Sequence, residues 1–427
     1  MRRLSLPVVL LVLGLPAVTR AQSPIAMTRA PAPPTLADVA ADRVPQAARL
    51  DDFRQREPGD LTPASQRTVA FVSYDSLNLY VGFLCRTAPG QRRAHLAKRE
   101  NIADDDQVAV YLDTFGDHQR AYVFAVNPLG VQYDAVLLEG DDEDPSFDAV
   151  WHADGTLTPD GFAVLMTIPF RALRFSGGPH TWGLALGRVV PGRAERDFWP
   201  AITSRIEGFT NQMATVTLRD ITSSVFADLI PYGAFTGARV LDESLPDLVS
   251  SADGRAGLDA RVVLHDRTAI AVTANPDFSE VESNEPQVTI NRRFEVYFPE
   301  RRPFFIESAD YFSTPDQLFY SRRVFDPAVG GRVTTAGHGW TFGALAVRDR
   351  AVASGDSDDS PSLVSVARLQ RSIGEHSRVA VLTTTRHQAT GDNAVVSVDA
   401  RLKLSPTWVL DRKSTRLNSS HVSESRM

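Results

Sequence analysis

The stretch from Asn275 to Arg323 divides the chain, and it reads NPDFSEVESNEPQVTINRRFEVYFPERRPFFIESADYFSTPDQLFYSRR. It is rich in aromatic residues and in charges of both signs, and no strand or helix periodicity runs through it. On either side of it, apolar and polar residues alternate with a period of two. An irregular segment in a β-rich chain must satisfy its backbone polar groups, and its aromatic side chains favour packing. We therefore expect a folded, plug-like connector between two β regions.

Length and composition are typical of a folded protein with at least two domains. The chain has 427 residues, of which 43% are hydrophobic and 23% are charged, and its net charge is -7. This charge gives no reason to expect a nucleic-acid partner. No window reaches the roughly 20 apolar residues of a spanning helix, which leaves soluble domains or a β-barrel. The single cysteine, Cys85, is expected to be a small buried strand residue.

The N-terminus has the features of a secretory signal. Met1 to about Ala21 contains two early arginines, an apolar run and a small residue at a cleavage point. A signal anchor that stays attached is the alternative. We expect an exported protein with a signal peptide at residues 1–21 and a linker at residues 22–33.

Short strand candidates recur between residues 34 and 222, separated by Gly, Pro and Asp turn signals. No convincing helical window lies between them, so the pattern predicts an antiparallel sandwich or barrel. The candidates are Thr68–Ser73, Leu77–Cys85, Gln107–Asp113, Arg120–Asn127, Gln132–Leu138, Gly161–Pro169, Trp182–Val190 and Gln212–Leu218.

Four stretches of this region follow one another in a familiar order. They are DDQVAVYLDTFGDHQRAYVFAVNPLGVQYDA, FDAVWHADGTLTPDGFAVLMTIPFRALRF, TWGLALGRVV and FWPAI. Their succession resembles the family 9 carbohydrate-binding modules and, more closely, relatives of these modules at the front of certain exported bacterial proteins. The resemblance implies a β-sandwich that binds sugar ends on an aromatic cleft. It also implies association with glycan hydrolases.

Sugar binding needs flat aromatic faces beside planar polar groups that form paired hydrogen bonds. The ligand-binding candidates are Trp151, Trp182, Trp199, Arg188 and Arg196, with Asp197 close in sequence. Trp199 lies where the resembling modules carry a cleft tryptophan. The family's other cleft tryptophan has no counterpart, because the early strand reads Tyr80-Val81-Gly82-Phe83. The alternative is that the three tryptophans fill or rim the sandwich core.

Two acidic clusters, Asp104–Asp106 and Asp141–Asp144, have more than one interpretation. A calcium site would use several hard oxygen ligands on a flexible loop, although the spacing is not that of an EF-hand. The alternative is a solvated turn that keeps a sheet edge from pairing. Glycoside hydrolysis also uses two carboxylates, but the sequence singles out no such pair. We expect no cofactor, with calcium as the alternative.

From residue 223 onward the alternation is cleaner, as in Arg255–His265 and Val396–Leu404. Strands of this length and pattern fit a membrane barrel with a polar interior, and the alternative is a soluble sheet with one wet face. Further candidates are Leu229–Leu241, Thr268–Ala274, Gln317–Val324, Gly339–Arg348, Leu363–Arg371 and Arg378–Arg386.

The opening stretch also resembles the signature of an uncharacterised barrel domain, which follows this kind of sandwich in many bacterial proteins. The resemblance implies an outer-membrane domain and no particular chemistry. We expect an ion network beside the packed rings of Phe304 and Phe305, formed by Glu300, Arg301, Arg302 and Glu307. About eight strand candidates follow residue 223, and residues 411–427 lack alternation and resemble a vector- or adapter-derived tail. We therefore expect residues 223–410 to be the first part of a barrel, followed by a non-native tail.

The expected fold is all-β: an antiparallel sandwich, then an incomplete antiparallel barrel with an irregular connector at residues 275–323. The expected function is carbohydrate binding by an exported outer-membrane protein, in glycan catabolism or uptake, with a saccharide and outer-membrane lipid as partners. The sandwich would be periplasmic or surface-exposed. One alternative is a glycoside hydrolase or its accessory module, and another is a structural envelope protein without sugar binding. No nucleotide-binding, zinc or nucleophile-elbow motif is present, so we assign no catalytic residue.

Overall fold

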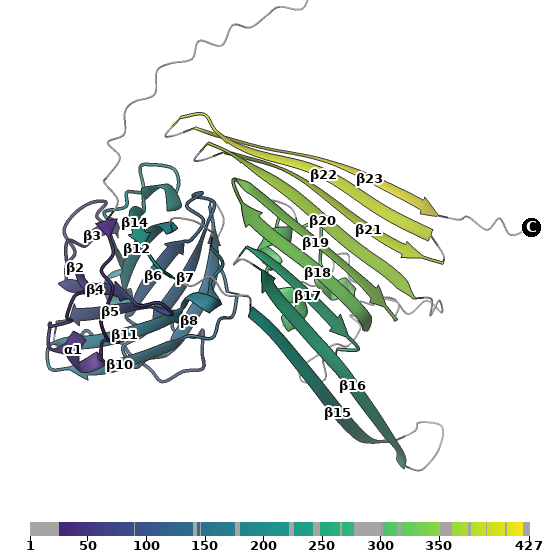
Figure 1. Cartoon of the computed structure of the whole chain (residues 1–427), viewed down its shortest axis with the longest axis horizontal. Helices are drawn as coiled ribbons and strands as arrows, with labels where there is room; N and C mark the ends of the chain where they lie inside the picture. The colour runs from purple at the N-terminus through teal and green to yellow at the C-terminus, as the bar shows by residue number, and fades with distance from the viewer. Residues whose placement is uncertain are drawn as a thin grey trace, which may run out of the picture.

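The computed structural model describes residues 25–88, 90–139, 143–145, 147–175, 180–221, 226–241, 248–264, 267–276, 300, 302–314, 317–350, 361–374, 377–389, 391–405 and 408–421. Almost all regular structure in them is β, and the two α-helices, α1 (Leu36–Ala40) and α2 (Pro303–Ile306), are short. Figure 1 shows a two-layered sandwich beside a third, larger sheet. These observations confirm the all-β fold.

The first sheet of the sandwich is antiparallel except at one edge, where β1 pairs with β14 in parallel. Its strands, in spatial order, are β1 (Ile25–Ala26), β14 (Ala214–Leu218), β12 (His180–Val190), β6 (Gln107–Asp113), β7 (Arg120–Val126), β8 (Gln132–Leu138) and β9 (Glu143–Asp144). Two further strands extend it from β12, namely β13 (Glu195–Trp199) and then β3 (Arg54–Glu57).

The second sheet is antiparallel and faces the first across the main core. Its strands, in spatial order, are β10 (His152–Thr158), β11 (Gly161–Pro169), β5 (Asn78–Arg86), β4 (Thr68–Tyr74) and β2 (Ala48–Leu50). Fully buried rings such as Phe83, Phe124 and Phe162 fill the space between the sheets. Cys85 is buried on β5, as expected.

Helix α1 covers the outer face of the second sheet. Thr35 and Asp38 form a capping box at its N-terminus, which satisfies backbone donors that the first turn leaves without partners. Val39 is fully buried and packs directly over Gly82 of β5, where a Cβ atom would lie 2.6 Å from a Val39 methyl group. The close approach explains the glycine at this point of the strand.

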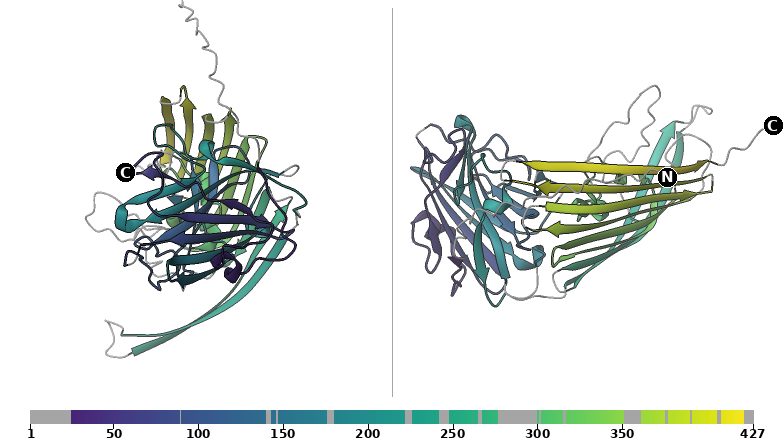
Figure 2. Two further views of the ribbon diagram at one scale, coloured as in Figure 1. Left: turned by 90° about the vertical axis from the view of Figure 1, so that its left-hand side faces the viewer. Right: turned by 90° about the horizontal axis from the view of Figure 1, so that it is seen from above.

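The third sheet is an antiparallel meander in which each strand pairs with the next one along the chain. Its nine strands are β15 (Phe226–Leu241), β16 (Leu248–Leu264), β17 (Thr268–Ala274), β18 (Pro327–Gly337), β19 (Trp340–Asp349), β20 (Ser362–Ile373), β21 (Ser377–Gln388), β22 (Gly391–Lys403) and β23 (Val409–His421). Within the described residues no sheet closes into a barrel, and β15 and β23 are the two edges of this one. The strands run away from the sandwich (Figure 2).

Three expectations about this sheet differ from the structure. Gln317–Val324 is not a strand, because its described residues form irregular chain and the 3-10 turn η5 (Ser321–Arg323). β18 was not expected, since no strand candidate was proposed for residues 327–337. β23 covers part of a segment that shows no alternation, and its backbone groups pair with β22.

The two faces of the third sheet differ in what covers them. The described part of the connector, with α2 and η4 (Ala309–Phe312), packs on one face, which we call the inner face. There Phe304, Phe305, Tyr311 and Phe312 form a cluster with apolar residues of five strands, which are Ala271, Ala336, Leu345, Val347, Val364, Val366 and Leu382. The connector is therefore packed, as its aromatic content predicts, and no described element covers the opposite, outer face.

Among the residues that the structure describes, no helix has both the length and the hydrophobicity required to cross a lipid bilayer.

Candidate functional site

Two of the three candidate tryptophans lie in the sandwich core. Trp182 is 1% exposed and contacts Phe170 and Phe175, and Trp151 is 7% exposed and packs edge-on against Phe124. Neither ring presents a face on which a sugar could stack. The structure therefore agrees with the alternative interpretation of these two residues as core.

Arg188 is also internal, which the sequence could not reveal. Its guanidinium is fully buried and donates to five oxygen atoms within 3.3 Å, which belong to Gln66, Arg67, Thr68, Arg86 and Thr87. These contacts hold the adjacent ends of β4 and β5 against β12. Arg188 thus joins the two sheets and does not reach a ligand.

Trp199 and Arg196 lie on β13, on opposite sides of the strand. Arg196 points outward, 59% exposed and 3.9 Å from Glu57, whereas Trp199 is half-buried against the core. Asp197 lies on the Trp199 side and is fully buried. Burial and the neighbouring Glu195 raise the pKa of Asp197 to about 8, against the opposing charge of Arg188. Of the five candidates, only Trp199 and Arg196 are accessible, and they do not converge on one surface.

The described carboxylates of the two acidic clusters bind separate partners within the protein and do not converge on a common point. Asp105 accepts hydrogen bonds from His95 and Asn127, and Asp106 accepts one from the Arg93 backbone, so both carboxylates fasten a loop. Glu143, in the second cluster, accepts hydrogen bonds from two tyrosines, and residues 141 and 142 lie outside the described residues. No group of three or more metal-ligating side chains is present in the described ranges.

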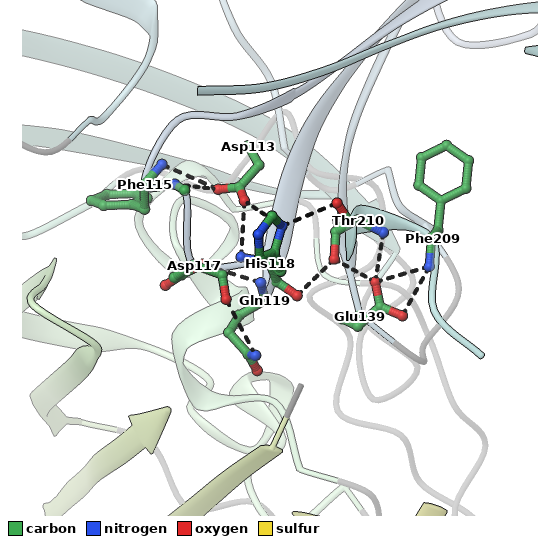
Figure 3. Close-up of polar contacts among 9 residues, drawn as sticks. Asp113, Phe115, Asp117, His118, Gln119, Glu139, Phe209 and Thr210 are labelled. Atoms are coloured by element: carbon green, nitrogen blue, oxygen red, sulfur yellow. Dashed lines mark hydrogen bonds and ion pairs between the residues drawn. The ribbon is translucent and has the colours of Figure 1, made fainter. Parts of the chain in front are cut away.

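A polar cluster fastens the loop between β6 and β7 to the loop before β14 (Figure 3). The buried carboxylate of Asp113 accepts hydrogen bonds from the backbone N–H groups of Phe115, Gly116 and His118. The Thr210 hydroxyl oxygen lies 2.6 Å from the His118 carbonyl and 2.5 Å from Glu139, and its single proton can be donated to either acceptor. The His118 ring contacts the Thr210 carbonyl, not its hydroxyl, so these residues do not form a nucleophile–base pair.

This loop brings the sandwich against the third sheet. The Phe115 ring packs against the aromatic cluster of the connector. On β7, Arg120 is 2.7 Å from Asp310 of the connector and its guanidinium lies 4.4 Å from the centre of the Tyr311 ring. Sequence alone could not have found this contact, because 190 residues separate the two charged partners.

Glu307 is the centre of the ion network at this junction. Its carboxylate is 2.6 Å from Arg332, 2.8 Å from Arg261 and 3.3 Å from Arg174. Burial alone would raise the pKa of Glu307, but the three guanidinium charges outweigh burial and lower it. Arg174 comes from the sandwich and the other two arginines from the third sheet, so Glu307 links all three parts. The expected network exists, with different partners, because Glu300 pairs with Arg302 separately, and Arg301 lies outside the described residues.

A cavity of about 170 Å³ lies at the junction, between the sandwich, the connector and β15–β16. Aromatic, cationic and acidic residues line it together. They include Arg120, Tyr122, Phe147, Arg171, Arg174, Asp228, Arg261, Glu307, Asp310 and Tyr311. None of the five candidates from the sequence lies here, and Arg171 and Arg174 gave no signal beyond their basic character.

Comparisons with known proteins cover the two halves separately. Residues 227–336 match a family model described as a domain of unknown function, DUF5916. No curated protein matches the chain.

Three solved structures are similar to slightly less than half of the chain. A Bacteroides uniformis protein, provisionally described as carbohydrate-binding, has 11% identity and a TM-score of 0.36, covering 46% of this chain and 98% of its own. A family 9 carbohydrate-binding module from Caldicellulosiruptor kristjanssonii with cellotriose has 12% identity and a TM-score of 0.31, covering 47% and 95%. The same organism's module with glucose has 12% identity and a TM-score of 0.32, covering 47% and 98%. These structural neighbours are carbohydrate-binding proteins, and at such scores they do not determine what this chain binds.

Proposed function

We propose that this chain is a carbohydrate-binding protein of an outer membrane, with the outer face of the third sheet in contact with lipid. The observation that carries the membrane part is the chemistry of that uncovered face. The sugar-binding part is supported by the resemblance of residues 34–222 to family 9 modules and by the accessible Trp199.

The outer face is apolar along its centre. Its central side chains are Leu258, Ile270, Val272, Val329, Val333, Phe342, Ala344, Ala346, Leu363, Ala367, Leu369, Val381, Val396 and Val398, with Ser365, Thr383 and Thr385 between them. Val396 and Val398 are 48% and 45% exposed. An apolar face of this extent is rare on a water-soluble monomer.

Charged side chains of the same strands lie on the inner face or at the rims. Arg332, Arg368 and Asp399 point inward and are at most 7% exposed. On the outer face of β19 and β20, Arg348 and Arg371 stand at opposite ends. The interval from Trp340 to Arg348 corresponds to about 27 Å along a strand, close to the height of a lipid-facing band.

Aromatic residues also occur where a membrane surface would lie. Trp340 at the start of β19 is 48% exposed, and the Arg371 guanidinium lies 4.9 Å from its ring centre. Trp408, just before β23, is 72% exposed at the same end of the sheet. Tryptophan and arginine are favoured at the boundary between lipid and water.

The connections between strands support an orientation. At the sandwich end, consecutive strands are joined by two to five residues. At the other end, residues 275–326 and 350–361 form long connections, while residues 242–247 and 389–390 form short ones. Outer-membrane proteins have short turns on the periplasmic side. We therefore propose that the sandwich lies in the periplasm.

A sheet in hydrocarbon cannot leave backbone groups without partners at its edges. The proposal therefore requires that β15 and β23 pair with further strands, either of a longer protein or of a second copy.

Vesicle flotation tests the membrane part. The full chain, folded in the presence of phospholipid vesicles, should rise with them in a density gradient and stay bound after a high-salt wash. A monodisperse, detergent-free chain that remains at the bottom would contradict the proposal.

Glycan-array binding tests the sugar part. We expect the detergent-solubilised chain to bind a saccharide, and Trp199→Ala to weaken that binding. If no saccharide binds at millimolar concentration, carbohydrate binding is excluded as the function.

A further inference from the structure

We propose that the junction cavity, between the sandwich and the connector, is a saccharide-binding site. This inference rests on the proposed carbohydrate binding and moves the site away from the β13 surface that the sequence favoured.

The cavity has an open mouth and a closed floor. Asp148, Val150 and Arg171 are exposed at its mouth, with Val150 79% exposed. Tyr311 and Arg120, at the floor, are 4% and 7% exposed. A small molecule can therefore enter from solvent and reach side chains that are shielded from it.

Two donors at the floor have no hydrogen-bond partner among the described residues. They are the hydroxyl of Tyr311 and the Nε atom of Arg120. A buried polar atom without a partner is costly, and such atoms are rare unless a ligand or water satisfies them. Neither atom is exposed in this structure, but both residues line the cavity. A small movement of either side chain toward a ligand with acceptor oxygens would therefore satisfy these donors.

The lining favours a neutral, hydroxyl-rich ligand. Four arginines are matched by four carboxylates, which are Asp148, Asp228, Glu307 and Asp310, so the site has no net charge to select an anion. The half-buried Phe147 ring provides apolar surface and packs against the buried ring of Tyr122, with ring centres 5.0 Å apart. Aromatic faces beside convergent donors and acceptors suit a pyranose, which has apolar C–H faces and polar edges.

Tyr311→Phe is the most direct test, because it removes only the hydroxyl. Since this hydroxyl has no partner in the described part of the chain, the variant should fold as well as the parent. The full chain in detergent would be titrated calorimetrically with glucose, xylose, cellotriose and glucuronate. We expect at least one of the three neutral sugars to bind. Tyr311→Phe should weaken that binding about fivefold to tenfold.

Tyr133→Phe is the matched control, because its hydroxyl donates to Glu143 outside the cavity and its loss should leave affinity unchanged. If Tyr311→Phe and the parent bound the sugar with equal affinity, the cavity would not be the binding site. If Trp199→Ala alone weakened sugar binding, the proposed function would stand without this inference. Preference for glucuronate would contradict the neutral-ligand argument. Absence of binding by every probe would instead refute the proposed function itself.

Discussion

Asp113 shows how one buried carboxylate fixes the loop that joins the sandwich to the third sheet. Its oxygens accept three backbone hydrogen bonds, yet burial and the nearby Asp117 raise the pKa of Asp113 to about 6, from 3.8. His118 and the backbone donors oppose this shift without cancelling it. The loop is therefore held by a group whose ionisation is unfavourable in the folded state.

We predict that Asp113 makes the stability of the sandwich depend on pH. Between about pH 4 and pH 6 the folded chain retains a proton that the unfolded chain has released, so stability falls as pH rises. The full loss is on the order of 3 kcal/mol. Asp113→Asn should lack this decline, which urea unfolding followed by fluorescence of the two core tryptophans would measure.

Asp160→Asn is the control for Asp113, because the Asp160 side chain is 72% exposed and pairs only with Arg86 at the surface. This variant should keep the parent's pH dependence. If Asp113→Asn also kept it, the buried carboxylate would not be its source.

At the residue scale, the sequence identified residue types that suit a ligand site. It could not show where each side chain lies. A basic residue and a tryptophan are compatible with either a ligand cleft or a core, and alternation does not separate the two when both sheet faces are covered. Arg188 and Trp182 are internal because both lie on β12 and face the second sheet across the sandwich core.

At the scale of elements, β18 shows how tertiary packing overrides local signals. Gly330 faces inward, where a Cβ atom would lie 3.0 Å from the Phe304 ring. Gly331 faces outward, where a Cβ atom would meet nothing within 4 Å. The glycine pair thus lies within a strand that the sequence did not predict, and Gly330 makes room for the connector. Thr268–Ala274 was predicted with the bounds that β17 has, whereas the strands with the cleanest alternation, β16 and β22, begin several residues earlier than predicted.

Valine substitutions at the two glycines should separate these roles. Gly330→Val would displace Phe304 and destabilise connector packing by about 1–3 kcal/mol. Gly331→Val should be neutral or slightly stabilising, because valine favours strands. Thermal unfolding, together with chymotrypsin cleavage within residues 300–323, would report both effects. Equal behaviour of the two variants would refute the assignment of the inner face.

At the scale of the whole molecule, the arrangement of the three sheets follows from contacts that no local pattern encodes. Arg401 and Lys403 at the end of β22 contact Glu207 of the sandwich, 194 and 196 residues away in sequence. The two-residue period predicted two β regions and a connector. It could not predict that the connector folds back to the sandwich and closes a cavity there.

An arginine at the centre of the outer face tests which solvent this face meets. Val381→Arg, on β21 between Leu369 and Val398, should cost about 2–4 kcal/mol if the face contacts lipid, and it should reduce vesicle binding. In water the same change at a half-exposed site should be within about 0.5 kcal/mol of neutral. His387→Arg is the control at the rim of the same face, where His387 lies 2.8 Å from Asp392, and it should bind vesicles normally.

Contact between Trp340 and lipid is the most direct measurement of the central claim. The full chain would be reconstituted in phosphatidylcholine vesicles with brominated acyl chains, and its tryptophan emission compared with that of Trp340→Phe. If the outer face lies against lipid, brominated chains will quench a component that is missing in the variant and that aqueous acrylamide quenches poorly. Equal quenching of both proteins by brominated lipid, with strong quenching of Trp340 by acrylamide, would contradict the account.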